Sequence, residues 1–172
     1  TGEIRGWAQL DGAGAGTEVA LSIPELEVAV SATADAQGRA AFNVTAKPQL
    51  WSPEQPTLYE VSVSAGDDTT TDRVGFRTVR REGDKILLNG KPVFLRGISM
   101  HEETVLRQGV ATGRADAEAQ FALAKQLGAN FVRLAHYPHN EHTVRLADEM
   151  GFMLWSEVPV YWAIDWRNED TR

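Results

Sequence analysis

The spacing of apolar residues changes near the middle of the chain, and no other feature of the sequence constrains the fold as strongly. In the first half, apolar side chains recur at every second position in short runs, such as Val19, Leu21 and Ile23. In the second half, short apolar runs alternate with segments of helical spacing. The first pattern is typical of half-buried strands, and the second of parallel β/α units. We therefore predict two domains, residues 1–82 and 83–172.

The first domain has the strand pattern of an all-β immunoglobulin-like sandwich. About six alternating runs fill it, bounded by Gly, Asp, Asn or Pro and without helical spacing. A sandwich alone does not indicate a function, because the architecture serves many activities. The segment LWSPEQPTLY at 50–59 interrupts the strand pattern. Its Trp51 could stack on a sugar ring, but a tryptophan beside prolines is more often a packing anchor, which is the interpretation we favour.

The second domain is predicted to start with a charged linker at 80–84 and a hairpin at Asn89-Gly90, a pair that favours a two-residue turn. Asp116 is placed to cap the first helix, and a glycine is expected to end each helix. The predicted order is strand 93–101, helix 116–127, strand 130–134, helix 141–150 and strand 152–156. The predicted buried faces are Ala117, Phe121, Ala124 and Leu127 in the first helix and Val144, Ala147 and Met150 in the second.

Polar side chains stand at the carboxyl end of each predicted parallel strand. They are His101 after the first strand, Arg133 and His136 at the second, and Glu157 after the third. Because the carboxyl ends of parallel strands share one edge of a sheet, these groups are expected to converge there. We interpret them as the rim of a pocket. For His136 the alternative is a loop histidine bonded to backbone.

Composition excludes several classes of function. The net charge is −7, the sequence pI is about 5.1 and no basic stripe is present, which argues against nucleic-acid and anionic-membrane partners. The chain has no cysteine, so disulfides and thiolate metal sites are excluded. No apolar run approaches the roughly 20 residues of a membrane span. Since the chain opens without Met or a signal peptide and stops in a polar run at 167–172, we expect a piece of a longer protein of unknown compartment.

Several segments together resemble glycoside hydrolase family 2, the family of β-galactosidases, β-glucuronidases and β-mannosidases. The most specific is NFVRLAHYP at 130–138, which combines fixed residues across a strand and a loop. Further matches are WSPEQPTLY, GFRTVRREGDKILLNGKPVFLRGISMHEE at 75–103, and Asp148 and Gly151 followed by the run FMLW. The resemblance covers most of residues 40–162.

The resemblance implies a modular enzyme with a jelly-roll domain, an immunoglobulin-like sandwich and a catalytic (β/α)8 barrel. This chain would supply the sandwich without its first strand, and three of the eight barrel strands. The implied reaction is retaining hydrolysis by two carboxyl groups about 5 to 5.5 Å apart. In the family both lie at the ends of later barrel strands, the first of them in an Asn-Glu pair after an apolar run. The two Asn-Glu pairs of this chain do not fit, because Asn140-Glu141 lies at a helix start and Asn168-Glu169 lies in a charged tail. The chain alone is therefore expected to be inactive.

The family's site residues map onto the strand ends. Arg133 matches an arginine that contacts the nucleophilic carboxylate, and the expected substrate-binding residues are His101, His136, Glu157 and Trp162. The implied substrate is a β-linked glycoside or oligosaccharide. β-Galactosidase is our first choice, with β-glucuronidase or β-mannosidase as alternatives. The sequence leaves a homo-oligomer open as an assembly state. A non-catalytic sandwich or carbohydrate-binding module is the alternative of another class.

We predict neither a cofactor nor a metal. The histidines at 136, 139 and 142 are three residues apart, which suggests zinc, but Pro138 would interrupt the helix needed to align them. Some relatives hold magnesium with a Glu and a His shortly after the third strand. The corresponding stretch here reads Tyr161, Trp162 and Ala163 and lacks those ligands.

Overall fold

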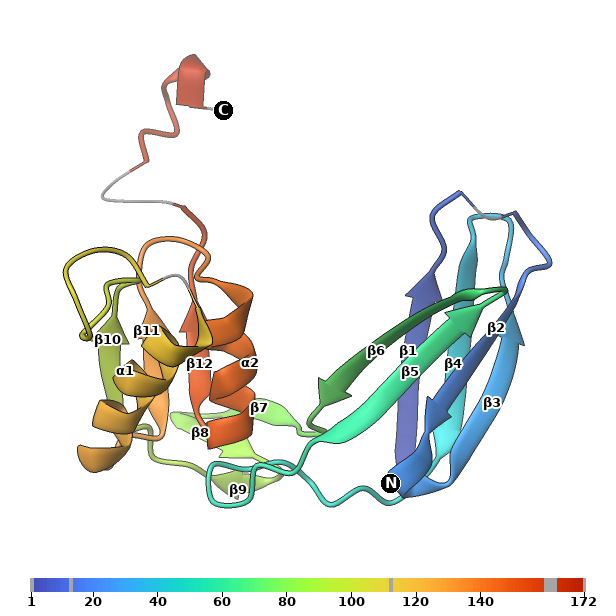
Figure 1. Cartoon of the computed structure of the whole chain (residues 1–172), viewed down its shortest axis with the longest axis horizontal. Coiled ribbons are helices and arrows are strands. Elements are labelled where there is room, and N and C mark those ends of the chain that lie inside the picture. The colour runs from blue at the N-terminus through green and yellow to red at the C-terminus, as the bar shows by residue number, and fades with distance from the viewer. Residues whose placement is uncertain (1, 13, 112, 160–163, 172) are drawn as a thin grey trace. The chain divides into compact units, whose positions relative to one another are not determined.

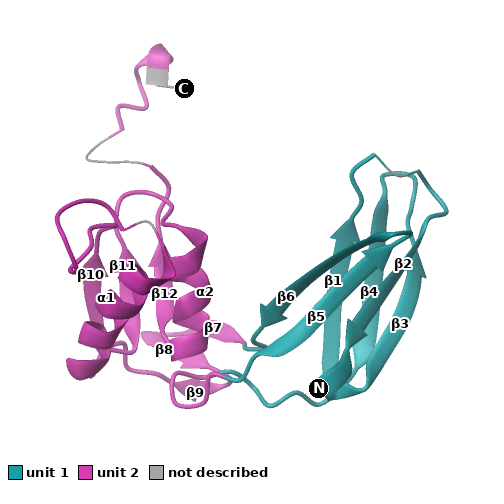
Figure 2. Cartoon of the chain, viewed as in Figure 1, with its two compact units in different colours: residues 1–51, 57–77 teal, residues 52–56, 78–172 magenta. Residues whose placement is uncertain are grey.

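The computed structural model describes residues 2–12, 14–111, 113–159 and 164–171 (Figure 1). The chain divides into two compact units (Figure 2): unit 1 comprises residues 1–51 and 57–77, and unit 2 comprises residues 52–56 and 78–172. The short segment at 52–56 therefore belongs with the second half of the chain. The domain limit between residues 82 and 83 stays a prediction.

Unit 1 is a sandwich of two antiparallel sheets. One sheet pairs β1 with β4, and the other has the order β3-β2-β5-β6. The strands are β1 (Glu3–Gln9), β2 (Glu18–Ile23), β3 (Val28–Thr33), β4 (Arg39–Thr45), β5 (Tyr59–Ala65) and β6 (Asp68–Val74), with a 3-10 turn, η1 (Pro24–Leu26), between β2 and β3.

The alternating apolar residues of unit 1 form its core, as their spacing predicted. Val19 and Leu21 of β2 are buried against Phe42 of β4. Because successive side chains of a strand point to opposite faces, one face of each sheet is apolar and faces the other sheet. Trp51 is fully buried, and a Cβ at Gly75 would lie 2.8 Å from its ring. This confirms the packing interpretation of Trp51.

The last strand of unit 1 differs from its prediction. The apolar residues Val74, Phe76 and Val79 predict one strand, but β6 ends at Val74, and β7 of unit 2 (Val79–Glu82) begins at Val79. Every residue of β6 is exposed, including a row of three threonines. An edge strand with so little buried surface has no alternation of apolar residues from which it could be predicted. It is identified in the structure by its backbone pairing with β5.

The predicted charged linker at 80–84 is wrong, because most of it is strand. β7, β8 (Lys85–Leu88) and β9 (Lys91–Pro92) form an antiparallel sheet at the start of unit 2. The turn between β8 and β9 has positive φ at both Asn89 (52°) and Gly90 (78°), as expected for the predicted hairpin. The sequence did not predict β7 because all four of its residues are exposed and three of them are charged.

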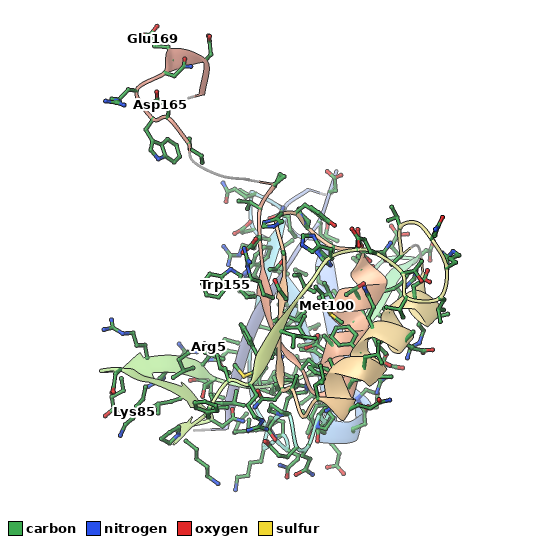
Figure 3. All side chains as sticks on the ribbon, turned by 90° about the vertical axis from the view of Figure 1, so that its left-hand side faces the viewer. Arg5, Lys85, Met100, Trp155, Asp165 and Glu169 are labelled. Carbon is green, nitrogen blue, oxygen red and sulfur yellow. The ribbon has the colours of Figure 1, made fainter. Side chains whose placement is uncertain are left out.

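Unit 2 continues with a parallel sheet of β10 (Gly97–Met100), β11 (Phe131–Leu134) and β12 (Met153–Ser156). The helices α1 (Arg114–Gln126) and α2 (Glu141–Met150) cover one face of this sheet (Figure 1). Figure 3 shows Met100 on the helix side and Trp155 on the opposite side. The tail ends in a 3-10 turn, η2 (Glu169–Thr171). No helix in the described part of the chain has the length and apolar character to cross a membrane.

Both predicted helices exist, but part of each predicted face is wrong. Leu127 follows the end of α1 and is 73% exposed, and Val144 is 37% exposed while Leu146 is buried. Asp116 does not cap α1; Gly113 holds that position without a side-chain bond, and Asp116 is buried in the first turn of the helix. The buried residues are Ala117, Phe121 and Ala124 in α1 and Thr143, Leu146 and Ala147 in α2.

Gly151 ends α2 in the left-handed conformation with φ 75°, as predicted for a helix stop. Its Cα also lies directly against the carbonyl of Pro53, so that a Cβ would overlap this oxygen. Pro53 belongs to a turn in which the Ser52 and Gln55 backbones exchange hydrogen bonds of 3.0 and 3.1 Å. The segment 52–56 therefore packs on Gly151 within unit 2, and a side chain at position 151 would overlap this segment.

The sheet face opposite the helices is partly exposed, since Ser99 is exposed and Phe131 and Met153 are half-buried. Trp155 on this face is 60% exposed. The in-register neighbours Ser99, Arg133 and Trp155 share this face, since side chains of the same register in parallel strands lie side by side. An arginine in the middle of a short strand thus points away from the apolar core.

Candidate functional site

The carboxyl ends of β11 and β12 bring Arg133 and Glu157 together. The guanidinium of Arg133 donates through Nε to Glu157 Oε1 (2.6 Å) and through Nη2 to Oε2 (3.2 Å). Two parallel bonds of this kind fix the plane of both groups. The side chains are 43% and 18% exposed, so the pair is open to solvent on one side. The bonds leave Nη1 as the nitrogen that Glu157 does not use.

His136 contacts the same carboxylate through its backbone and its ring. Its N–H donates to Glu157 Oε2 (2.6 Å), and its Nδ1 lies 3.6 Å from that oxygen. The backbone has φ 75°, a left-handed conformation that costs a residue other than glycine about 1–3 kcal/mol. Such a conformation persists where neighbouring groups hold it, and the bond to Glu157 is one of these.

His101 lies beside His136, as the convergence of strand ends predicted. The two rings have centroids 5.1 Å apart at an angle of 52°. Gln120 of α1 donates from Nε2 to the carbonyls of His101 (3.0 Å) and Glu103 (2.5 Å), which anchors the chain where it leaves β10. His101 itself is exposed. Two accessible imidazoles therefore stand next to an arginine and a carboxylate.

Glu157 is held in its ionised form. The hydrogen bond from Arg133 lowers the pKa of the Glu157 carboxyl most strongly, and the His136 N–H adds to the effect. A carboxylate that already receives three donors is a poor proton donor and a poor nucleophile. Its chemical role is thus to orient Arg133 and His136. The remaining donors can bind hydroxyl groups or a further carboxylate.

One predicted substrate-binding residue and the histidines of the zinc alternative remain. Trp162 lies outside the described residues. His139 is 9% exposed, with Nε2 3.4 Å from the Ala135 carbonyl, and its ring stacks on Tyr137 at 5.0 Å. Among the residues that the structure describes, no three histidine or carboxylate side chains gather as metal ligands, and His136, His139 and His142 form no such group.

The contacts of two acidic residues of unit 2 were not predicted from the sequence. Glu102 accepts a hydrogen bond from the Asn140 N–H, while its neighbour Glu103 is exposed. Asp116 accepts bonds from Thr104 (2.5 Å) and Arg107 (2.6 and 3.0 Å). No spacing rule identifies these partners, because they lie in irregular loops.

Two family models match this chain. The model of the glycosyl hydrolases family 2, TIM barrel domain, matches residues 79–166, and the model of the glycosyl hydrolases family 2 matches residues 9–77. The chain belongs to glycosyl hydrolase family 2. The predicted fold class is confirmed, namely a family 2 sandwich followed by the start of the barrel domain, whose described sheet has three strands and is open.

Several curated proteins are similar over most of this chain. A β-galactosidase from Arthrobacter sp. (strain B7) is 36% identical over 160 residues, which cover 85% of this chain and 15% of that protein. A β-glucuronidase from Paenibacillus borealis is 32% identical over 157 residues, or 84% of this chain and 26% of that protein.

Among solved structures, a Bifidobacterium dentium β-glucuronidase complexed with coumarin-3-O-glucuronide matches with a TM-score of 0.80 and 26% identity. The match covers 91% of this chain and 27% of that one. The chain thus spans between 15% and 27% of the length of these three relatives.

Proposed function

We propose that this chain is part of a longer retaining β-glycoside hydrolase, and that the ends of β10, β11 and β12 bind the sugar. The observation that carries the proposal is the network of Arg133, His136 and Glu157 at the carboxyl edge of a parallel sheet. In barrel enzymes this edge holds the active site. Membership of a glycosyl hydrolase family supports the reaction class.

In this proposal Arg133 binds the nucleophilic carboxylate through Nη1, the nitrogen that Glu157 leaves. A cation within about 4–6 Å keeps a carboxylate ionised, which a nucleophile requires. His101 and His136 bind sugar hydroxyls, and such bonds raise kcat where they strengthen in the transition state. Glu157 holds the Arg133 side chain and the His136 backbone in place. Trp162 is proposed as a further substrate contact.

The proposed sugar is a β-galactoside, with a β-glucuronide as the second candidate. The Arthrobacter relative, named β-galactosidase, supports the first. The structural match to the β-glucuronidase of Bifidobacterium dentium supports the second. β-Mannosides are the third candidate of the same family.

The test is hydrolysis of nitrophenyl β-galactoside, β-glucuronide and β-mannoside by the full-length protein that contains this chain. We expect the highest kcat/KM for the β-galactoside. A higher value for the β-glucuronide would change the sugar and keep the reaction class. No hydrolysis of any β-glycoside would favour the alternative, a non-catalytic carbohydrate-binding or structural module.

Residues 1–172 alone are expected to hydrolyse none of these substrates, because the acid/base and nucleophile carboxylates are proposed to lie on other barrel strands. The same nitrophenyl assay on the isolated chain checks this expectation. Turnover above the buffer rate would show that the chain carries its own catalytic pair and would contradict the assignment of Arg133 as a supporting residue.

A further inference from the structure

Glu102 joins the loop after β10 to the loop that carries His136. Its N–H donates to the Tyr137 hydroxyl (3.1 Å). Its carboxylate accepts from the Asn140 N–H. One residue therefore holds the loop at 135–140 at two points, once through its backbone and once through its side chain.

The start of the same loop is held by the sheet. The Ala135 N–H donates to the Met100 carbonyl (3.0 Å), which extends the pairing of β10 and β11 by one residue. Together with the bonds of Glu102, this contact fixes the loop at its beginning, middle and end. The two loops should therefore move as one body.

Glu102 is the chain neighbour of His101, and its partner Tyr137 is the chain neighbour of His136. The two imidazole rings are 5.1 Å apart between centroids. A change in the Glu102 bonds is therefore expected to alter the spacing of the rings, because Glu102 adjoins His101 and its partners Tyr137 and Asn140 lie in the loop that follows His136.

The backbone of His136 needs such support. Its φ of 75° is unfavourable for a side chain with a Cβ, and it persists where surrounding bonds over-determine it. The Glu157 carboxylate holds the His136 N–H from β12. Glu102 holds the residues that follow His136 from the β10 side. The imidazole is thus oriented from two separate strands.

We propose that Glu102 is a positioning residue for substrate binding, and that its two hydrogen bonds set the distance between His101 and His136. This inference rests on the proposed function, in which both histidines contact the sugar. Glu102 itself contacts backbone and hydroxyl groups of the protein. Its removal should therefore lower catalysis through misplaced histidines while the fold persists.

The experiment compares Glu102→Ala, Glu102→Gln and Glu103→Ala in the full-length protein. Glu102→Ala is expected to lower kcat/KM about tenfold or more, with the melting temperature changed by no more than about 2 °C. Glu102→Gln should stay within about threefold of wild type, because the amide oxygen still accepts from the Asn140 N–H. Glu103→Ala is the matched control, since its exposed side chain lies on the same loop.

A second variant, Tyr137→Phe, removes the hydroxyl and keeps a ring that can stack on His139. It is expected to lower kcat/KM about threefold to tenfold. Equal losses in Glu102→Gln and Glu102→Ala would overturn the positioning role, because the acceptor would then be irrelevant. A loss of activity in Glu102→Ala matched by a large fall in melting temperature would overturn it too.

Hydrogen exchange of peptides covering 135–140 separates this inference from the proposed function. Glu102→Ala should raise their exchange rate severalfold, while Glu102→Gln and Glu103→Ala should not. If wild type hydrolyses no β-glycoside, the proposed function fails, and with it the role of Glu102 in catalysis. If wild type is active but Glu102→Ala changes neither exchange nor kcat/KM, only the positioning role fails.

Discussion

Two arginine–carboxylate pairs in unit 2 have similar lengths and different surroundings. Arg107 binds Asp116 through both terminal nitrogens, at 2.6 and 3.0 Å, and the Asp116 side chain is 5% exposed. Arg133 binds Glu157 through Nε and Nη2, and Glu157 is 18% exposed. In the first pair, both terminal nitrogens of the arginine bind Asp116. In the second pair, the Nη1 nitrogen of Arg133 does not bind Glu157, which leaves it for another acceptor.

The two carboxylates also differ in the other groups that they bind. Asp116 also accepts from Thr104, whose hydroxyl in turn accepts from the Leu106 N–H (3.1 Å). These contacts fold a loop onto the start of α1. Glu157 instead accepts from His136, whose ring lies beside another accessible histidine. Similar ionic chemistry thus serves loop folding at one place and, in our proposal, sugar binding at the other.

The strongest test removes the arginine from each pair in the full-length protein. Arg133→Ala is expected to lower kcat/KM about a hundredfold or more, equivalent to about 2.7 kcal/mol, because the nucleophile loses its cation. Arg107→Ala should change kcat/KM less than about threefold. Steady-state kinetics on the preferred nitrophenyl glycoside measure both. Similar losses in the two variants would remove the functional distinction between the pairs.

Stability should show the opposite ranking. Asp116→Ala is expected to lower the free energy of unfolding by about 2 kcal/mol, because it removes a nearly buried acceptor and leaves the Thr104 hydroxyl without this partner. Denaturant unfolding of the 172-residue chain measures the change. Glu118→Ala is the control, since its exposed pair with Arg114 should contribute no more than about 0.5 kcal/mol. An equally small effect in Asp116→Ala would contradict the structural role of the buried aspartate and its partners.

The left-handed backbone of His136 gives a third test. His136→Ala should lower kcat/KM about tenfold or more and leave the melting temperature nearly unchanged. His136→Gly should be as inactive but more stable than His136→Ala by about 1 kcal/mol, because glycine adopts a positive φ without strain. Thermal melting of the two variants decides the point. A less stable glycine variant would argue against strain at this position.

The smallest expected effect is a dependence of stability on pH. The pKa of Glu157 is lowered in the folded protein by Arg133 and the His136 N–H. A group with a depressed folded pKa stabilises the fold fully above its ordinary pKa of 4.5, and this contribution is lost as the pH falls through the lower folded value. The melting temperatures of wild type and Glu157→Gln should therefore differ above pH 5 and converge below pH 4.5. A constant difference down to pH 3 would refute this linkage.

The sequence predicted secondary structure best where apolar residues recur with a regular period because they all enter the same buried core. In β2, Val19, Leu21 and Ile23 alternate because alternate positions enter the core, so the strand could be predicted from them. β6 and β7 gave no such signal, because their side chains are exposed and their pairing is carried by backbone groups. Helix positions were predicted well, but the exposed Val144 and Leu127 were placed inside.

The candidate site was predictable in its main members for a topological reason. Parallel strands end at one edge, so His101, Arg133, His136 and Glu157 could be grouped before their distances were known. Their roles as substrate and nucleophile contacts stay predictions. The contacts of Glu102 depend on irregular loop backbone, which no periodicity describes.

The close packing of Gly151 on Pro53 has a consequence for the exchange of domains between members of family 2. The turn at 52–56 lies between strands of unit 1 in the sequence, yet it belongs to unit 2. The peptide chain therefore passes between the units after residues 51, 56 and 77. A recombination event with one crossover at residue 77 would take the turn from one gene and the glycine beneath it from another. An exchange of the sandwich at residue 77 alone would thus separate two segments that pack directly on each other in this chain.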